Sequence, residues 1–473
     1  MTLAGLATVV TTNDEVRQSE DAFFRASSVC LRERTPSPAD PKGRIAMELE
    51  TAPSSKKTDS HFPMADALPP TTEHDADTKG AVDASSDRAS RGAPALAGPS
   101  SVARKTSRAK LVLFALATLF VVLFRPAKQH VAAAELLGRF ANPKAQVQGL
   151  EESEIRVPTP RGDVRAKIFS PPGKTGLPGV VLVHGVHYQG IDESRFLRFA
   201  RSLADTGLVV LAPEIAELAD YHVDPRSLDT IGATLDVLAK RTHRDTVGLM
   251  GMSFGGGMAL LTASDPRFRD RVGFVVAVGA HDDLARTLRF FATSTIALPD
   301  GTVRTQKSHD YGAMVLVYNR VDDFFPAPDR EESRLALRSW LQEKRDLARE
   351  HAAKTSPASK AKLEEIFTTD LAGIRPELLR IVDTHKDDDT GVSPHGHLAG
   401  LRAPVYLLHG ADDTVIPASE TLWLAQDVPK GLLRQAVVSA AIRHVEVEGE
   451  PSLAQKWELL HFMGEVLGEA SRL

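Results

Sequence analysis

The middle of the chain carries the stretch VGLMGMSFGGG, which runs from Val247 to Gly257. Its first four residues are apolar or glycine and predict a buried strand, and the apolar residues 258–262 that follow predict a helix. The pattern Gly-x-Ser-x-Gly at 251–255 lies between them, and glycine permits the close backbone approach that a sharp turn requires. The sequence therefore predicts a strand, a tight turn and a helix, with the hydroxyl of Ser253 held clear of the sheet at the helix N-terminus.

Short β-branched runs recur on both sides of this stretch. Together with 247–250 they predict eight strands, at 155–158, 164–169, 180–183, 208–212, 247–250, 272–278, 405–408 and 433–438. Amphipathic stretches between them, such as 194–204 and 227–239, predict helices. Near-continuous apolar strands that alternate with helices are typical of a mostly parallel sheet covered on both faces. We therefore expect an α/β core over residues 151–281 and 402–473.

The interval 282–401 breaks this alternation. It has no strong strand pattern but shows charged helical patterns at 284–291, 331–350 and 360–381. An independent second domain is the alternative, but the series of strands resumes afterwards. We therefore interpret 282–401 as a helical cap inserted into the core.

Charge and cysteine content exclude several classes of protein. The 473 residues contain 57 Lys and Arg against 62 Asp and Glu, a formal net charge of −5, so the chain lacks the basic excess of a nucleic-acid-binding protein. The single cysteine, Cys30, excludes an intrachain disulfide and a Cys-rich zinc module.

The N-terminal third differs from the rest in composition. Between positions 41 and 100, 36 of 60 residues are Ser, Thr, Pro, Ala or Asp. A segment of this composition cannot bury enough apolar surface to offset the conformational entropy that is lost when the chain becomes ordered. We predict a disordered polar tail over 1–105, a hydrophobic segment within 106–128 and a linker over 129–150.

The hydrophobic segment centres on 111–124, where Thr118 is the single polar residue. As a helix this run spans about 21 Å, which is shorter than a bilayer core of about 30 Å but suits an uncleaved signal-anchor or an export signal. A buried helix is the third interpretation. Four cations precede the run and two follow it, which favours a membrane-anchored or exported protein with its C-terminal domain on the non-cytoplasmic side. If translation started near Val102, the hydrophobic run would lie close to the N-terminus, as in an ordinary export signal.

Two further motifs accompany Ser253. The sequence GADDTVIP at 410–417 follows a predicted strand, and His444 follows the last predicted strand. Over residues 150–470 the chain resembles the α/β-hydrolase superfamily, whose nucleophile, acid and base occur in the order Ser, Asp, His. The compact core is similar to that of dienelactone hydrolases, but those use a cysteine, and Cys30 lies in the polar tail.

The resemblance implies a catalytic triad. Ser253 would be the nucleophile, His444 the base that takes its proton, and Asp413 the carboxylate that orients the imidazole. Asp412 is the adjacent alternative for the acid, and Asp282, at the end of an earlier strand, is a further alternative.

The resemblance also implies an oxyanion hole. The strand at 180–183 ends in His184-Gly185, so the backbone N–H groups of Val186 and Phe254 would be the donors. His184 itself is expected to order the loop. Residues that could contact substrate are His187, Tyr188 and His281; an exposed loop is the alternative for the first two.

We expect no cofactor and no metal ion. His395-Gly396-His397 with the acidic residues 387–389 is interpreted as a chance cluster, because no closed set of ligands is present. The sequence thus favours hydrolysis of a small-molecule ester, thioester or amide through an acyl-Ser253 intermediate. A serine peptidase, an acyltransferase and a membrane-tethered binding protein with a vestigial triad remain alternatives.

Overall fold

The computed structural model describes residue 112 and residues 127–473, except for positions 143, 146, 370, 444, 445 and 448–451. The predicted polar tail lies outside the described residues, as does the hydrophobic run 111–124 apart from Val112. Within the described part of the chain, no helix combines the length and apolar character needed to cross a membrane. The tail and the membrane segment therefore stay predictions.

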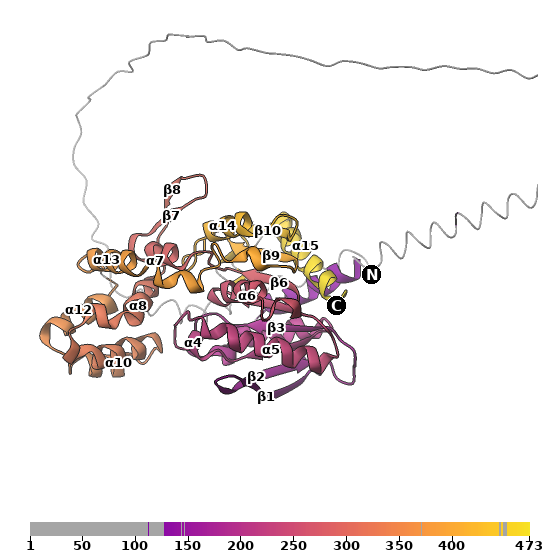
Figure 1. The fold of residues 1–473 in the computed structure, drawn as a ribbon, viewed down its shortest axis with the longest axis horizontal. Coiled ribbons are helices and arrows are strands. Elements are labelled where there is room, and N and C mark those ends of the chain that lie inside the picture. The colour runs from indigo at the N-terminus through magenta and orange to yellow at the C-terminus, as the bar shows by residue number, and fades with distance from the viewer. Residues whose placement is uncertain are drawn as a thin grey trace, which may run out of the picture. The chain divides into compact units, whose positions relative to one another are not determined.

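An eight-stranded sheet forms the centre of the described domain (Figure 1). Its strands are β1 (Glu151–Thr159), β2 (Gly162–Ser170), β3 (Gly179–Val183), β4 (Val209–Pro213), β5 (Val247–Met252), β6 (Val272–Val278), β9 (Val405–Gly410) and β10 (Leu433–Ser439). Their spatial order is β1-β2-β4-β3-β5-β6-β9-β10. β2 is antiparallel to its neighbours β1 and β4, and the strands from β4 to β10 run parallel. All eight predicted strands and the mostly parallel sheet are confirmed.

Helices cover both faces of the sheet. Those of the core are α3 (Ser194–Asp205), α4 (Ala216–Ala219), α5 (Arg226–Thr242), α6 (Phe254–Ser264), α14 (Ser419–Asp427) and α15 (Leu453–Ala470). On β3, Val181 and Val183 pack into one apolar cluster with α5 and α6, and Val180 and Leu182 pack into a second with α3 and α15. Because successive side chains of a strand point to opposite faces, both faces of β3 are dry, which accounts for its unbroken apolar sequence.

The insertion between β6 and β9 is helical, as predicted. It contains α7 (Leu284–Thr293), α8 (Asp310–Asn319), α9 (Val321–Phe324), α10 (Arg330–Leu341), α11 (Arg345–Ala352), α12 (Pro357–Phe367) and α13 (Arg375–His385), and a hairpin of β7 (Thr295–Ala297) and β8 (Val303–Thr305). Helices α8, α10 and α12 share a third apolar cluster and gather on one side of the sheet in Figure 1.

Two long helical patterns predicted in the insertion are each divided in the structure. The first is interrupted at Glu343 and the second at Thr369, and both residues have a positive φ, 64° and 60°. A left-handed residue cannot continue a right-handed helix, so α10 ends before α11, and α12 ends before α13.

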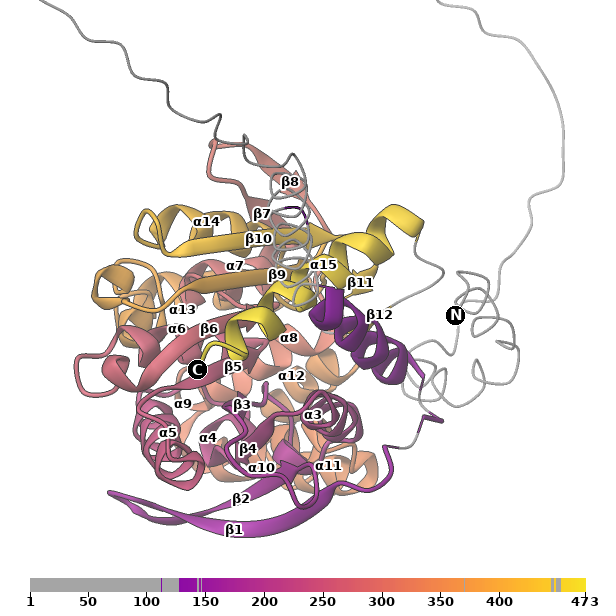
Figure 2. The same ribbon diagram turned by 90° about the vertical axis from the view of Figure 1, so that its right-hand side faces the viewer.

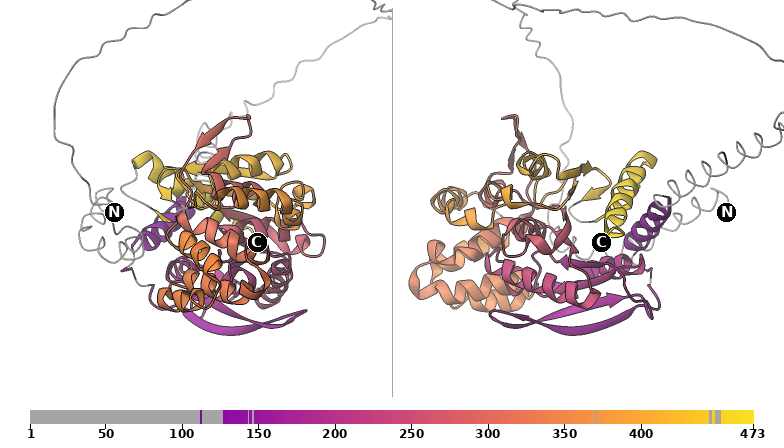
Figure 3. Two further views of the ribbon diagram at one scale, coloured as in Figure 1. Left: turned by 90° about the vertical axis from the view of Figure 1, so that its left-hand side faces the viewer. Right: turned by 45° about the vertical axis from the view of Figure 1, so that its right-hand side comes forward.

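The predicted linker over 129–150 is wrong for its first half. Residues 127–141 form a helix that lies beside α15 in Figures 2 and 3. Ala133, Leu136 and Phe140 are buried in the same apolar cluster as α3 and α15. Phe140 packs edge-on against Phe199 of α3, with ring centroids 5.2 Å apart. Three apolar residues at helical spacing cover a groove of the core, so this helix is part of the folded domain.

Candidate active site

Ser253 occupies the turn between β5 and α6. Its backbone has φ 54° and ψ −134°, a conformation that non-glycine residues rarely adopt. A Cβ at Gly251 would lie 2.2 Å from the carbonyl oxygen of Gly255, and a Cβ at Gly255 would lie 2.3 Å from that of His184. The two glycines of the motif are therefore required by backbone contact, and the turn predicted from them is confirmed.

Ser253 lines an open cleft of about 80 Å³. The side chain is 4% exposed, and its Oγ has no hydrogen-bond partner among the residues described. The cleft is also lined by the loop after β3 (His184, Gly185, Val186, His187 and Gly190), by Glu193, Arg195 and Phe196 at the start of α3, and by Met252 and Phe140.

Both predicted oxyanion donors belong to segments that touch Ser253. Val186 lines the cleft, and a Cβ on the preceding Gly185 would lie 2.9 Å from the Cβ of Ser253. Phe254 is the first residue of α6, so its N–H is one of those that lack an acceptor within the helix. The segments that carry both N–H groups therefore lie beside Ser253, and their assignment as oxyanion donors stays a prediction.

His184 fixes the loop that carries Val186. Its Nε2 accepts a hydrogen bond from the N–H of Ile215 at 3.0 Å, so its Nδ1 donates to the carbonyl oxygen of Gly185 at 2.7 Å. Burial lowers the pKa of His184 to about 4, so the ring is neutral at pH 7. These contacts support the structural role expected for this histidine.

Asp413 lies in the loop after β9 and is fully buried, whereas the neighbouring Asp412 is exposed. Oδ1 of Asp413 accepts hydrogen bonds from the N–H groups of Val415 at 2.7 Å and Ile416 at 3.0 Å. Oδ2 lies 3.4 Å from Nε2 of His409. Two backbone donors orient this carboxylate, which favours Asp413 over Asp412 as the acid.

His444, the predicted base, lies outside the described residues. The structure describes the short strands on either side of it, β11 (Ile442–Arg443) and β12 (Glu446–Val447), which pair in antiparallel fashion. β11 contacts β9, the strand that leads into the loop of Asp413. The triad itself therefore stays a prediction.

The three residues expected to contact substrate differ in position. His187 lines the cleft, and its ring packs on that of Tyr188 with centroids 4.8 Å apart. Tyr188 packs against the apolar cluster of the insertion. His281 is fully buried, with Nε2 2.9 Å from the carbonyl oxygen of Val392 and its ring against Gly257, so its expected substrate contact is not supported.

Asp282, the further alternative for the acid, pairs with an arginine of the insertion. Its Oδ2 accepts a hydrogen bond from Arg286 at 2.8 Å, and the same guanidinium bonds to Glu420, which is also fully buried. Burial raises the pKa of Asp282 to about 7 and the nearby Glu420 raises it too, whereas Arg286 opposes this shift.

Sequence reasoning missed several residues of the cleft. Glu193 and Arg195 are joined by an ion pair of 2.8 Å, and Glu193 also caps the N-terminus of α3. Phe140 comes from the helix at 127–141, which the sequence placed in a linker. An aromatic residue at helical spacing with Ala133 and Leu136 was the one signal that could have located it.

Comparison with known proteins gives distant structural matches. No family model and no curated protein sequence matches the chain. Among solved structures, 2,6-dihydroxy-pseudo-oxynicotine hydrolase is 16% identical with a TM-score of 0.37, over 67% of this chain and 68% of that one. An esterase from Pyrobaculum calidifontis is 17% identical with a TM-score of 0.38, over 74% and 93%. An acylaminoacyl peptidase from Pyrococcus horikoshii is 12% identical with a TM-score of 0.36, over 67% and 40%.

The fold assignment rests on the chain's own geometry. The sheet has one antiparallel edge followed by parallel strands, and the turn after β5 holds a serine at positive φ before a buried helix. A buried aspartate follows β9, so serine and acid stand in the expected order along the chain. By this sheet order and this turn, the chain has the α/β-hydrolase fold.

Proposed function

We propose that this protein is a serine hydrolase that cleaves a carboxylic ester, thioester or amide through an acyl-Ser253 intermediate. The observation that carries the proposal is the side chain of Ser253, which is held in a strained turn and lines a cleft, and whose buried Oγ lacks a hydrogen-bond partner among the described residues. Strain of this kind is retained where function needs the side chain in one position.

In the proposed reaction, Oγ of Ser253 attacks the substrate carbonyl carbon while His444 accepts the hydroxyl proton. The N–H groups of Val186 and Phe254 stabilise the oxyanion that forms. His444 then gives the proton to the departing alcohol, thiol or amine, and water releases the acid from Ser253 by the same steps. Asp413 holds the tautomer and orientation of His444.

An ester is our first choice of substrate within this reaction. A serine peptidase, an acyltransferase, and a binding protein whose triad is vestigial are the competing functions for the same fold. We also propose that residues 111–124 anchor or export the protein with this domain on the non-cytoplasmic side.

The test is labelling of the full-length protein with a fluorophosphonate probe, followed by hydrolysis of short p-nitrophenyl esters. We expect the wild type to react in both assays and Ser253→Ala to lose both reactions. Ser227→Ala is the matched control, because Ser227 in α5 is also buried and its Oγ also lacks a partner among the described residues.

Equal labelling of the wild type and Ser253→Ala would overturn the proposal. Labelling that depends on Ser253 without ester hydrolysis would favour the peptidase or the acyltransferase. If this equal labelling is weak in both proteins, it would favour the binding protein whose triad is vestigial.

A further inference from the structure

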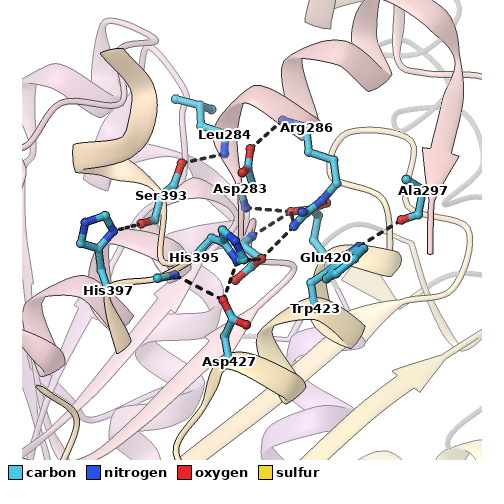
Figure 4. A network of polar contacts seen from close by, with 12 residues as sticks. Asp283, Leu284, Arg286, Ala297, Ser393, His395, His397, Glu420, Trp423 and Asp427 are labelled. Carbon is cyan, nitrogen blue, oxygen red and sulfur yellow. Dashed lines mark hydrogen bonds and ion pairs between the residues drawn. The ribbon is translucent and has the colours of Figure 1, made fainter. Parts of the chain in front are cut away.

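Three polar side chains meet where the insertion joins the core, and Figure 4 shows two of them, His395 and Asp427, next to each other. Asp282 follows β6, where the chain enters the insertion; His395 lies where the chain returns from it; and Asp427 is the last residue of α14. Nδ1 of His395 lies 2.6 Å from Oδ2 of Asp427 and 3.5 Å from Oδ2 of Asp282. One ligand atom from each residue lies within 4.8 Å of the other two.

The carboxyl group of Asp282 is incompletely satisfied. Its side chain is fully buried, and its Oδ2 accepts a hydrogen bond from Arg286. Its Oδ1 is also buried and has no hydrogen-bond partner among the described residues. A buried acceptor without a partner is costly, so this carboxyl group, whose Oδ2 lies 3.5 Å from Nδ1 of His395, has capacity for a further ligand.

Several carboxyl groups surround this position. Asp282, Asp427 and Glu420 provide three carboxyl groups. Arg286 is in contact with Asp282 and Glu420, and His395 is the ion-pair partner of Asp427. Arg286 directs two of its nitrogens to Glu420, at 2.6 and 3.0 Å, and a third contact of 2.8 Å to Asp282. Three carboxyl groups thus share one guanidinium and one imidazole. A divalent cation that takes the place of the proton on Nδ1 of His395 would add positive charge between Asp282 and Asp427.

We propose that Asp282, His395 and Asp427 bind one divalent transition-metal ion. The ligands would be one carboxylate oxygen each of Asp282 and Asp427 and Nδ1 of His395. One imidazole with two carboxylates suits Zn²⁺ and its neighbours better than Ca²⁺ or Mg²⁺. His395 is half-exposed, so water can reach the ion and complete its coordination. Binding requires that the proton on Nδ1 of His395 leave or move to Nε2.

This site differs from the cluster of His395, His397 and the acidic residues 387–389, which the sequence led us to interpret as a chance cluster. His397 donates from Nδ1 to the carbonyl oxygen of Ser393 at 3.0 Å and does not join His395. The ligands come instead from three segments more than thirty residues apart in sequence, so no local motif contains them. An ion held here would tie the start of the insertion to its end and to α14.

Metal content of the full-length protein tests the proposal. The protein is stripped with a chelator, dialysed against Zn²⁺ and assayed for bound zinc, and its Zn²⁺ affinity is measured by calorimetry. We expect one tight equivalent in the wild type and a fall in affinity of at least about tenfold in His395→Gln and in Asp427→Asn. The melting temperature should rise with Zn²⁺ in the wild type and not in these two variants.

The control is His351→Gln. His351 also pairs with a carboxylate, Glu332 at 2.7 Å, and the structure gives that pair no third ligand among the described residues. This variant should bind Zn²⁺ as the wild type does. Circular dichroism checks that each variant is folded, and the absorption spectrum of bound Co²⁺ reports ligand loss independently of stability. A wild type without a tight equivalent, or equal affinity and equal Co²⁺ spectra in wild type and His395→Gln, would overturn the proposal.

Discussion

Individual residues at the candidate site have their conformation set by close backbone contacts. Gly251 and Gly255 allow close contact between backbone segments, and Ser253 adopts a strained backbone conformation with a positive φ. His184 is held by one N–H and one carbonyl group, and Asp413 by two N–H groups. A site built from backbone contacts is rigid, as a preorganised catalytic group requires.

The choice between Asp413 and Asp412 can be tested at this scale. Asp413→Asn should lower kcat by as much as about 10⁴-fold, because an amide holds the imidazole in the wrong tautomer. Asp412→Asn should leave kcat within about twofold of wild type, because Asp412 is exposed. Steady-state kinetics on a p-nitrophenyl ester provide the measurement, and an effect of similar size in both variants would remove Asp413 from the triad.

Among the elements, the helix at 127–141 connects the N-terminal region to the cleft. It is anchored by Leu136 among α3 and α15, and its salt bridge from Arg139 to Asp205 fixes it to the end of α3. Phe140, near its C-terminal end, forms part of the cleft beside Ser253. A segment that precedes the sheet therefore shapes the candidate substrate site.

We expect Phe140→Ala to change specificity. Removal of the ring enlarges the cleft, so the ratio of kcat/KM for a long-chain to a short-chain p-nitrophenyl ester should rise by about tenfold or more. Leu136→Ala is the control: it lies on the same helix and is buried, but it does not line the cleft. It should lower stability by about 2–5 kcal/mol and leave the ratio unchanged. An unchanged ratio in Phe140→Ala would show that the ring does not limit the substrate.

At the scale of the whole domain, the insertion is fastened to the core by buried charge. Arg286 of α7 bonds to Glu420 of α14 and to Asp282 after β6, and both carboxylates are fully buried. The guanidinium also lies over the ring of Trp423, 4.6 Å from its centroid. A single side chain of the insertion thus joins the start of the insertion to the C-terminal half of the core sequence.

Loss of this contact should be costly. Arg286→Gln leaves two buried carboxylates without their cation, and we expect it to lower the free energy of unfolding by about 3–5 kcal/mol. Arg289→Gln, on the same helix, breaks an ion pair with Asp383 in which both side chains are about half exposed, so it should cost at most about 1 kcal/mol. Urea denaturation in the presence of a chelator compares the two, and equal costs would contradict this account.

Sequence alone located all eight strands. The central strands β3, β5, β6 and β9 are buried on both faces and are therefore nearly continuous apolar runs. The outer strands β1 and β10 are largely exposed or alternate in burial, and short β-branched runs located them instead. It also located the turn at Ser253, because glycine is needed wherever backbones approach this closely. Helix α8 was not predicted: Ala313, Met314, Val315, Leu316 and Val317 are all buried, so the segment has no polar face and no helical period. The position of helix 127–141 was missed because its apolar face is matched only by a groove that α3 and α15 create.

The residues of the candidate sites also divide into those that a local sequence pattern located and those that only the tertiary structure located. A local motif revealed Ser253 and Asp413, because a turn and a short loop set their geometry within a few residues. The tertiary structure alone brought Phe140 to the cleft, buried His281 away from it, and gathered Asp282, His395 and Asp427 at the base of the insertion. Contacts between segments far apart in sequence leave no local pattern, because each residue is selected by neighbours that only the folded chain supplies.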